Sequence, residues 1–148
     1  LEEQVNLGGV TLNLVDTAGI RKTDDYVESI GVEKAKKYAQ DADLVIFVVD
    51  SSRPLDKNDD DIISLIQNKN VIVLLNKSDM EQVVKPEDLK NLNKFSMVSI
   101  SAKNETGLDK LEHAIKDMFF NGEISFNEEI YMCVIKRFYR RHLTAFIW

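Results

Sequence analysis

The stretch VIVLLNKSD, residues 71–79, decides the fold class of this chain. Its first five residues are apolar and fit a strand that is buried on both faces of a parallel sheet. The strand then ends directly in Asn76-Lys77-Ser78-Asp79, at the carboxyl edge where open α/β sheets bind their ligands. A carboxylate such as Asp79 only accepts hydrogen bonds. It can therefore pair with the N1–H and N2–H donors of a guanine, and adenine has no matching pair.

Two more predicted strands end in the same manner. Leu12–Val15 runs into Asp16-Thr17-Ala18-Gly19, and Met97–Ile100 runs into Ser101-Ala102-Lys103. Asp16 stands where a nucleotide-bound Mg²⁺ could be reached through a water molecule. Gly19 can present its N–H to a γ-phosphate with no Cβ in the way. The simpler interpretation of each motif alone is a polar turn. Together, in this order, the three motifs predict the second half of a guanine-nucleotide-binding domain.

The phosphate loop of such a domain is not found in the sequence. Only 15 residues precede Asp16, and they contain no Gly-x-x-x-x-Gly-Lys-Ser/Thr motif. That motif supplies the backbone N–H groups and the lysine that hold the β- and γ-phosphates. Gly8 and Gly9 instead predict a hairpin turn between strands at Glu3–Leu7 and Val10–Val15. We therefore expect a partial domain whose isolated chain is inactive.

Strand and helix patterns alternate along the rest of residues 1–120, which predicts an α/β fold. The run Leu44–Val49 is apolar throughout and predicts a second strand that is buried on both faces. Amphipathic patterns predict helices over Val27–Ala39, Asn58–Gln67 and Gly107–Phe119, and a short helix over Glu87–Leu92.

Composition limits the possible classes of protein. The chain has 148 residues and a net charge of −6, so one domain is expected and no general attraction to nucleic acid. Cys133 is the only cysteine, which suits a reducing compartment, and we expect a cytoplasmic location. The sequence shows neither an N-terminal secretion signal nor an apolar run of membrane-spanning length, so no membrane partner is expected.

The segment 121–148 changes in character. Residues 121–127 read as a linker, and the remainder is predicted to form a divergent C-terminal helix that holds a basic cluster of Lys136, Arg137, Arg140 and Arg141. The simpler interpretation is a helix that packs on a neighbouring domain. A basic nucleic-acid-binding helix is the alternative, but nothing else in the sequence supports it, so we expect no direct nucleic-acid binding.

The three motifs resemble those of translation-factor-related GTPases, and the segment after Asp16 narrows the resemblance. In small signalling GTPases the residue after Asp-x-x-Gly is a glutamine that orients the attacking water. Here it is Ile20, which has no polar side-chain atom. Residues 27–33 read Val-Glu-Ser-Ile-Gly-Val-Glu. This pattern closely resembles the MnmE (TrmE) family of tRNA-modifying GTPases, over residues 2 to about 131.

The resemblance implies a partial Ras-like P-loop GTPase domain, with a mostly parallel sheet, one antiparallel edge strand and helices on both faces. It implies that Glu28 orients the catalytic water, although an ordinary acid in the first turn of a helix is the alternative. It also implies that GTP or GDP is bound with Mg²⁺ and K⁺. The nucleotide-binding residues would be Asp16, Thr17, Ala18, Gly19, Asn76, Lys77, Ser78, Asp79, Ser101, Ala102 and Lys103.

Individual roles follow from the same resemblance. Asp79 would read the guanine edge, the Lys77 stem would cover the base plane, and Asn76 would tie neighbouring loops together. The Ala102 N–H would meet the guanine O6, and Lys103 would lie along the base. The intact family proteins form homodimers and act with the flavoprotein MnmG on the wobble uridine of certain tRNAs.

Two alternatives remain open at the level of sequence. The chain could be a nucleotide-incompetent remnant or an interaction module. It could also be a fragment of the ribosome-assembly GTPase Der, whose switch also reads Asp-Thr-Ala-Gly-Ile-Arg. The Der family lacks the Val-Glu-x-Ile-Gly-x-Glu pattern of residues 27–33, which favours the MnmE family.

Overall fold

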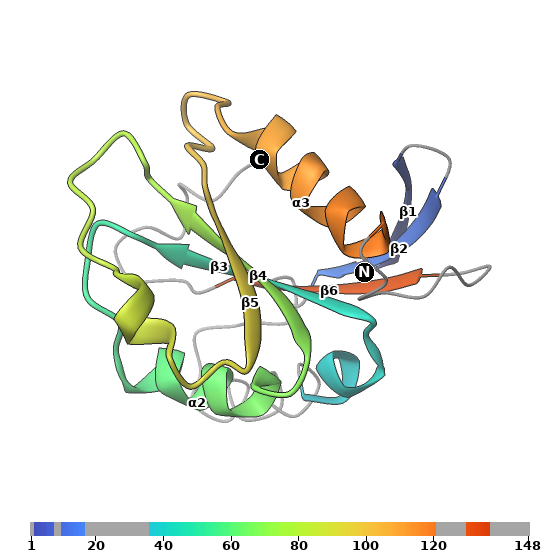
Figure 1. Ribbon diagram of the computed structural model, residues 1–148, viewed down its shortest axis with the longest axis horizontal. Helices are drawn as coiled ribbons and strands as arrows, with labels where there is room; N and C mark the ends of the chain where they lie inside the picture. The colour runs from blue at the N-terminus through green and yellow to red at the C-terminus, as the bar shows by residue number, and fades with distance from the viewer. Residues whose placement is uncertain (1, 8–9, 17–35, 121–129, 137–148) are drawn as a thin grey trace.

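The computed structural model describes residues 2–7, 10–16, 36–120 and 130–136 of the chain. Two strands come first, and strands then alternate with helical elements (Figure 1). The order is β1 (Glu2–Leu7), β2 (Val10–Asp16), β3 (Leu44–Asp50), α2 (Lys57–Ile66), β4 (Asn70–Asn76), the 3₁₀ helix η2 (Pro86–Leu89), β5 (Lys94–Ser99), α3 (Leu108–Phe120) and β6 (Ile130–Lys136). Residues 36–41 are also helical.

The strands form a six-stranded sheet in the order β1-β2-β6-β3-β4-β5. The pairs β2–β6, β6–β3, β3–β4 and β4–β5 are parallel, and β1 pairs antiparallel with β2 from Glu2 opposite Val15 to Leu7 opposite Val10. Parallel neighbours need long crossover connections, which the intervening helices supply. The predicted α/β class with a mostly parallel sheet is confirmed.

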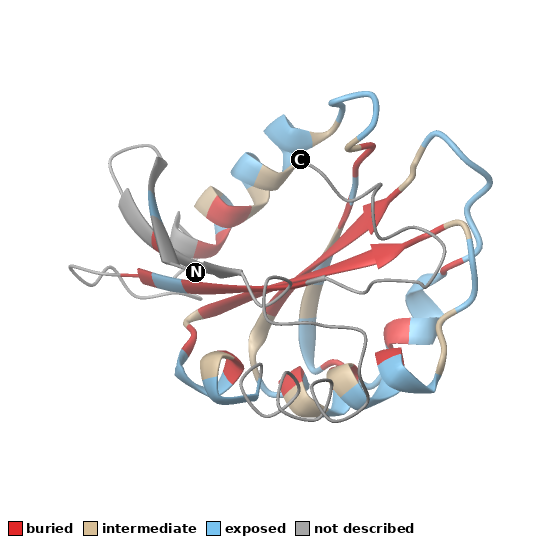
Figure 2. Cartoon of the chain, turned by 180° about the vertical axis from the view of Figure 1, so that it is seen from behind, coloured by how far each residue is buried: buried red, intermediate tan, exposed pale blue. Residues whose placement is uncertain are grey.

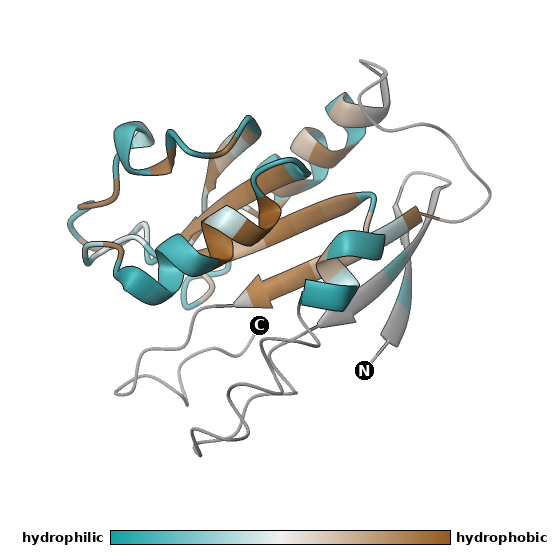
Figure 3. Cartoon of the chain, turned by 90° about the horizontal axis from the view of Figure 1, so that it is seen from below, coloured by the Kyte–Doolittle hydropathy of each residue, from teal (hydrophilic) through white to brown (hydrophobic). Residues whose placement is uncertain are grey.

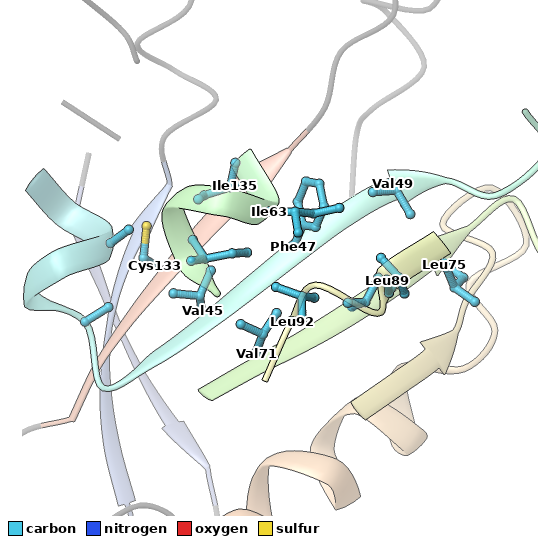
Figure 4. Packing of buried hydrophobic residues seen from close by; sticks show 14 of the residues in the cluster. Val45, Phe47, Val49, Ile63, Val71, Leu75, Leu89, Leu92, Cys133 and Ile135 are labelled. Carbon is cyan, nitrogen blue, oxygen red and sulfur yellow. The ribbon is translucent and has the colours of Figure 1, made fainter. Parts of the chain in front are cut away.

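Two apolar layers lie on opposite faces of the sheet. Along β3, alternate side chains point to opposite faces, so Leu44, Ile46 and Val48 belong to the layer under α3. Val45, Phe47 and Val49 belong to the layer under α2 and η2 (Figure 4). All seven residues of β3 are buried, which explains why the first six, Leu44–Val49, are apolar without alternation. Figures 2 and 3 show the buried, hydrophobic strands between helices whose outer faces are exposed and polar.

Helix α2 begins at a reciprocal cap. The Asp59 N–H donates to Asp56 Oδ1 at 3.1 Å, and the Asp56 N–H donates to Asp59 Oδ2 at 2.8 Å. These two bonds satisfy N–H groups that the first turn of a helix leaves without partners. The helix then places Ile63 and Ile66 in the layer beneath it.

The C-terminal segment, which was predicted to be helical, contains strand β6. Over Ile130–Lys136 the predicted helix is wrong, because these residues form a parallel strand between β2 and β3. Ile130, Met132, Cys133, Val134 and Ile135 are all buried. A strand that is paired on both edges and covered on both faces has no polar alternation. The helix was predicted from the change in composition at this segment. Composition does not show that these residues pair with both β2 and β3.

The described helices are too short, or too polar, to cross a lipid bilayer, so no membrane-spanning helix is found in this part of the chain.

Candidate functional site

The carboxyl ends of β3, β4 and β5 meet at one edge of the sheet (Figure 1). Asp50 at the end of β3 lies opposite Asn76 at the end of β4, and Leu75 lies opposite Ser99. The chain after β5 stays attached to β4, because the Ile100 N–H donates to Leu75 O at 2.9 Å and the Ser78 N–H donates to Ile100 O at 3.0 Å. Two of the three predicted motifs are thereby held side by side.

Asn76 connects these two motifs through its side chain. Its Oδ1 atom accepts hydrogen bonds from the Lys77 N–H at 2.8 Å and from the Ala102 N–H at 3.1 Å. Asn76 is buried, so these bonds replace water that the amide and the two N–H groups would otherwise need. The predicted tie between loops is confirmed. In this structure the Ala102 N–H donates to Asn76, and its role toward the guanine O6 stays a prediction.

Asp79 is exposed, and Ser101 holds one of its oxygens. The Ser101 hydroxyl donates to Asp79 Oδ1 at 2.9 Å, and the same Oγ atom accepts a hydrogen bond from the Asn104 N–H at 3.2 Å. Ser101 itself is buried. The carboxylate that the sequence assigns to a guanine edge is therefore kept in a defined orientation at the surface of the site.

Lys77 is held at both ends. Its φ of 66° lies in the left-handed region, which a residue with a Cβ adopts at a cost. Its carbonyl accepts hydrogen bonds from the Met80 N–H at 3.0 Å and from Gln82 Nε2 at 2.9 Å. At the other end, Lys77 Nζ lies 2.9 Å from Asp50 Oδ2, and the two side chains are 18% and 2% exposed. This is a nearly buried ion pair between the ends of β3 and β4.

The carboxyl group of Asp50 is ionised well into the acid range. Burial disfavours its charged form, but hydrogen bonds from the Ser52 hydroxyl, the Lys77 ammonium and the Ser52 N–H, together with the Lys77 charge, outweigh burial. The pKa of Asp50 therefore lies below its ordinary value of 3.8. At neutral pH the pair is a carboxylate facing an ammonium group.

The sequence prediction missed the residues at the end of β3 and directly after it. Besides Asp50, the Ser51 hydroxyl lies 2.6 Å from Asn76 O and 2.5 Å from Gln82 Oε1. Gln82 Nε2 also donates to Met80 O at 2.8 Å and so closes the turn that contains Asp79. A signal was available, because Asp50-Ser51-Ser52 directly follows the apolar run Leu44–Val49, as the recognised motifs follow theirs.

The loop after Ser101 is closed by its own backbone. Ser101 and Thr106 exchange two N–H···O bonds of 3.0 and 3.1 Å, and Gly107 then turns into α3 with a φ of +88°. A Cβ at Gly107 would lie 2.4 Å from Ser99 O, so only glycine fits this position. Lys103 lies in this loop and its side chain is exposed. That it lies along the base stays a prediction.

Asp16 is the last residue of β2, and Thr17, Ala18, Gly19, Ile20 and Glu28 lie outside the described residues. Because β6 stands between β2 and β3, the register places Asp16 level with Val134 and Ile46, rather than with Asp50. Among the described residues, no group of three or more His, Cys, Asp and Glu side chains could hold a metal ion.

A family model described as 50S ribosome-binding GTPase matches residues 1–77. Three curated relatives are each named tRNA modification GTPase MnmE. The protein from Lachnoclostridium phytofermentans is 50% identical over 132 residues, which are 89% of this chain and 29% of that protein. The protein from Staphylococcus epidermidis is 43% identical over 133 residues, 89% of this chain and 29% of that protein. The protein from Acetivibrio thermocellus is 40% identical over 137 residues, 92% of this chain and 30% of that protein.

The chain thus spans about three tenths of the length of the curated relatives that it matches. The family model ends at Lys77, so it covers Asn76 and Lys77 but neither Asp79 nor Ser101-Ala102-Lys103. On the family model and these relatives, the chain belongs to the 50S ribosome-binding GTPase family and is similar to tRNA modification GTPases named MnmE.

Proposed function

We propose that this chain supplies the guanine-recognising part of a GTPase that acts in tRNA modification. The observation that carries the proposal is the hydrogen bond from Ser101 to Asp79, because it joins the second and third motifs around the carboxylate that is expected to read the base. The names of the three relatives support the assignment to tRNA modification.

The base would lie over the loops that follow β4 and β5. Asp79 would accept hydrogen bonds from N1–H and N2–H of guanine, and the methylene stem of Lys77 would pack on the base plane. Lys103 would lie along the other side of the base, in the exposed loop that Gly107 terminates. Asn76, Ser78 and Ser101 contribute by holding these loops, since each makes a hydrogen bond to the neighbouring motif or turn.

The phosphates and the metal ion would lie nearer β2. Mg²⁺ in nucleotide sites takes one or two protein carboxylates, with phosphate oxygens and water as its other ligands. Asp16 is the last residue of β2 and lies level with Ile46 rather than with Asp50, so it is its donor type and its place in the sequence that fit that role. The Gly19 N–H would meet the γ-phosphate, and Thr17 and Ala18 would belong to the same nucleotide-binding motif. K⁺ is proposed only from the resemblance of residues 27–33 to the MnmE family.

The larger cycle is also a proposal. The intact protein would hydrolyse GTP in the cytoplasm, form a homodimer, and act with MnmG on tRNA. The net charge of −6 suits a fragment that makes no direct contact with nucleic acid. Residues 1–148 contain no phosphate loop, so hydrolysis would need a restored full-length protein, in which the regions that the relatives carry outside the match are joined to this sequence.

The test is a change of base selectivity in that restored protein. Asp79→Asn replaces one acceptor oxygen by a donor, so the variant should lose guanosine triphosphate binding and gain xanthosine triphosphate binding. A site built for hydrogen bonds can discriminate against a mismatched partner by about 10⁴-fold. Titration calorimetry with both nucleotides measures the change, and Glu81→Gln at a nearby exposed position is the control. Unaltered guanine preference in Asp79→Asn would refute the proposal.

A further inference from the structure

Asp50 has no role among the three motifs, although it is one of the most deeply buried polar residues at this edge. We infer that Asp50 is a positioning residue for the nucleobase: its carboxylate holds the Lys77 ammonium, so that the methylene stem of Lys77 is arranged for packing on the base. The inference rests on the proposed function, because the base that would pack on Lys77 is the guanine of the proposed site.

The Asp50–Lys77 contact is much less exposed to water than an ordinary surface pair. Lys77 Nζ and Asp50 Oδ2 are 2.9 Å apart, and the side chains are 18% and 2% exposed. Exposed ion pairs are flexible and contribute little, whereas a buried charge without its partner is costly. The ammonium group of Lys77 therefore has one favoured position, against the end of β3.

Asp50 is itself fixed, so it can act as an anchor. Its Oδ1 accepts hydrogen bonds from the Ser52 N–H at 3.0 Å and from the Ser52 hydroxyl at 2.5 Å. Its Oδ2 is left for Lys77. The backbone of Asp50 is also held, because it pairs with Asn76 in the parallel register of β3 and β4. Because the Asp50 carboxylate is held by the sheet and by Ser52, the Lys77 ammonium group that it binds is held in place too.

Fixing both ends of Lys77 has a consequence for binding. A free lysine side chain loses conformational entropy when it is ordered. Here the backbone end is held by Asn76 and Gln82, and the ammonium end by Asp50. A base that packs on the stem would meet a side chain that is already ordered, and would bind more tightly.

The stem is apolar and can contact the face of any purine. Loss of Asp50 should therefore weaken all purine nucleotides by the same factor, without altering which base is preferred. This is the opposite of the effect expected for Asp79, which would read the edge of the base. The two roles can be separated by comparing guanosine diphosphate with inosine diphosphate, which lacks the N2 amino group.

The experiment compares the restored full-length protein with Asp50→Asn, Lys77→Met and the double variant. Titration calorimetry measures the dissociation constants for both nucleotides, and thermal unfolding shows that each variant is folded. We expect Asp50→Asn to weaken both nucleotides about tenfold, the scale of a charge-assisted hydrogen bond. In the Lys77→Met background, Asp50→Asn should change neither constant further. Glu112→Gln removes the partner of Lys116 in an exposed pair on α3 and should leave both constants unchanged.

A second variant covers the case in which Asp50→Asn does not fold. Ser52→Ala keeps the charge pair but removes one hydrogen bond to Oδ1, and Ser52 lies at an intermediate, partly exposed position. It should weaken both nucleotides by an equal and smaller factor, again only when Lys77 is present. Unequal effects on the two nucleotides, effects that persist with Lys77→Met, or no change in affinity would overturn the inference. If the unsubstituted restored protein binds neither nucleotide, the proposed function itself fails.

Discussion

Asn76 Oδ1 lies 3.1 Å from the backbone N of Ala102, across 26 positions of sequence, and this contact helps to join the loops that follow β4 and β5. The same oxygen accepts the Lys77 N–H at 2.8 Å. Both donors depend on this single buried side chain, so shortening Asn76 is expected to loosen both motifs, although the Ser101–Asp79 bond still connects them.

Asn76→Ala should lower the free energy of unfolding of the chain by about 2 kcal/mol, because two backbone donors lose their acceptor. Urea unfolding followed by circular dichroism measures the change. The matched control is Asn93→Ala, which removes an exposed amide that donates to Asn68 Oδ1 at 2.6 Å. The control should change stability by less than about 0.5 kcal/mol. Equal effects of the two variants would show that the tie between loops contributes nothing.

The Asp50–Lys77 pair should make stability depend on pH. The pKa of Asp50 is lowered in the folded state, so its contribution is fully present above the ordinary value of 3.8 and is lost as the pH falls through the lower folded value. Asp50→Asn should cost about 2 kcal/mol at neutral pH. The difference between the chain and this variant should be constant at neutral pH and shrink as the pH falls below 3.8. A difference that stays constant over the whole range would contradict the assignment.

The 148-residue chain should bind GTP weakly or not detectably. Its sequence lacks the loop whose N–H groups and lysine hold the phosphates, and these supply most polar contacts to a triphosphate. Titration calorimetry should show no saturation below about 1 mM GTP. The restored full-length protein is the positive control. Tight, saturable binding by the 148-residue chain would mean that the phosphates are held by other residues.

Glu28→Ala in the restored protein should abolish GTP hydrolysis and leave GTP affinity nearly unchanged. Ile20 has no polar side-chain atom and cannot orient water, and the resemblance of residues 27–33 assigns that task to Glu28. A group that acts on the attacking water contributes mainly in the transition state. Turnover at saturating GTP and potassium measures the loss. The controls Asp24→Ala, Asp25→Ala and Glu33→Ala should retain turnover, and the same loss in any of them would point to a different residue.

Ile130→Ala should destabilise the chain by about 3 kcal/mol, because Ile130 is fully buried in the central strand β6. Leu108→Ala removes a side chain of similar size that is 45% exposed, and should cost less than about 1 kcal/mol. Urea unfolding of the two variants gives the comparison. If Ile130→Ala were as mild as Leu108→Ala, β6 would not be part of the cooperative core.

Several elements were predictable because their signal is local. The runs Leu44–Val49 and Val71–Leu75 are apolar without alternation, and both form buried parallel strands, β3 and β4. The polar residues that follow such a run must lie at the carboxyl edge, and for this reason the sequence alone assigns Asn76, Asp79 and Ser101 to one site. The helix over Gly107–Phe119 was predicted from its amphipathic pattern and is observed as α3 (Leu108–Phe120).

The sequence by itself therefore determined the α/β class, the strands β3 and β4, and the assignment of Asn76, Asp79 and Ser101 to the edge. Only the tertiary structure decided that Ile130–Lys136 is a strand between β2 and β3, and that Asp50 pairs with Lys77 across 27 positions. The physical reason is the range of the interactions. An apolar run shows that a strand is buried, but its neighbours depend on hydrogen bonds to segments far away in the chain. The partner of a buried carboxylate likewise depends on the register between two strands.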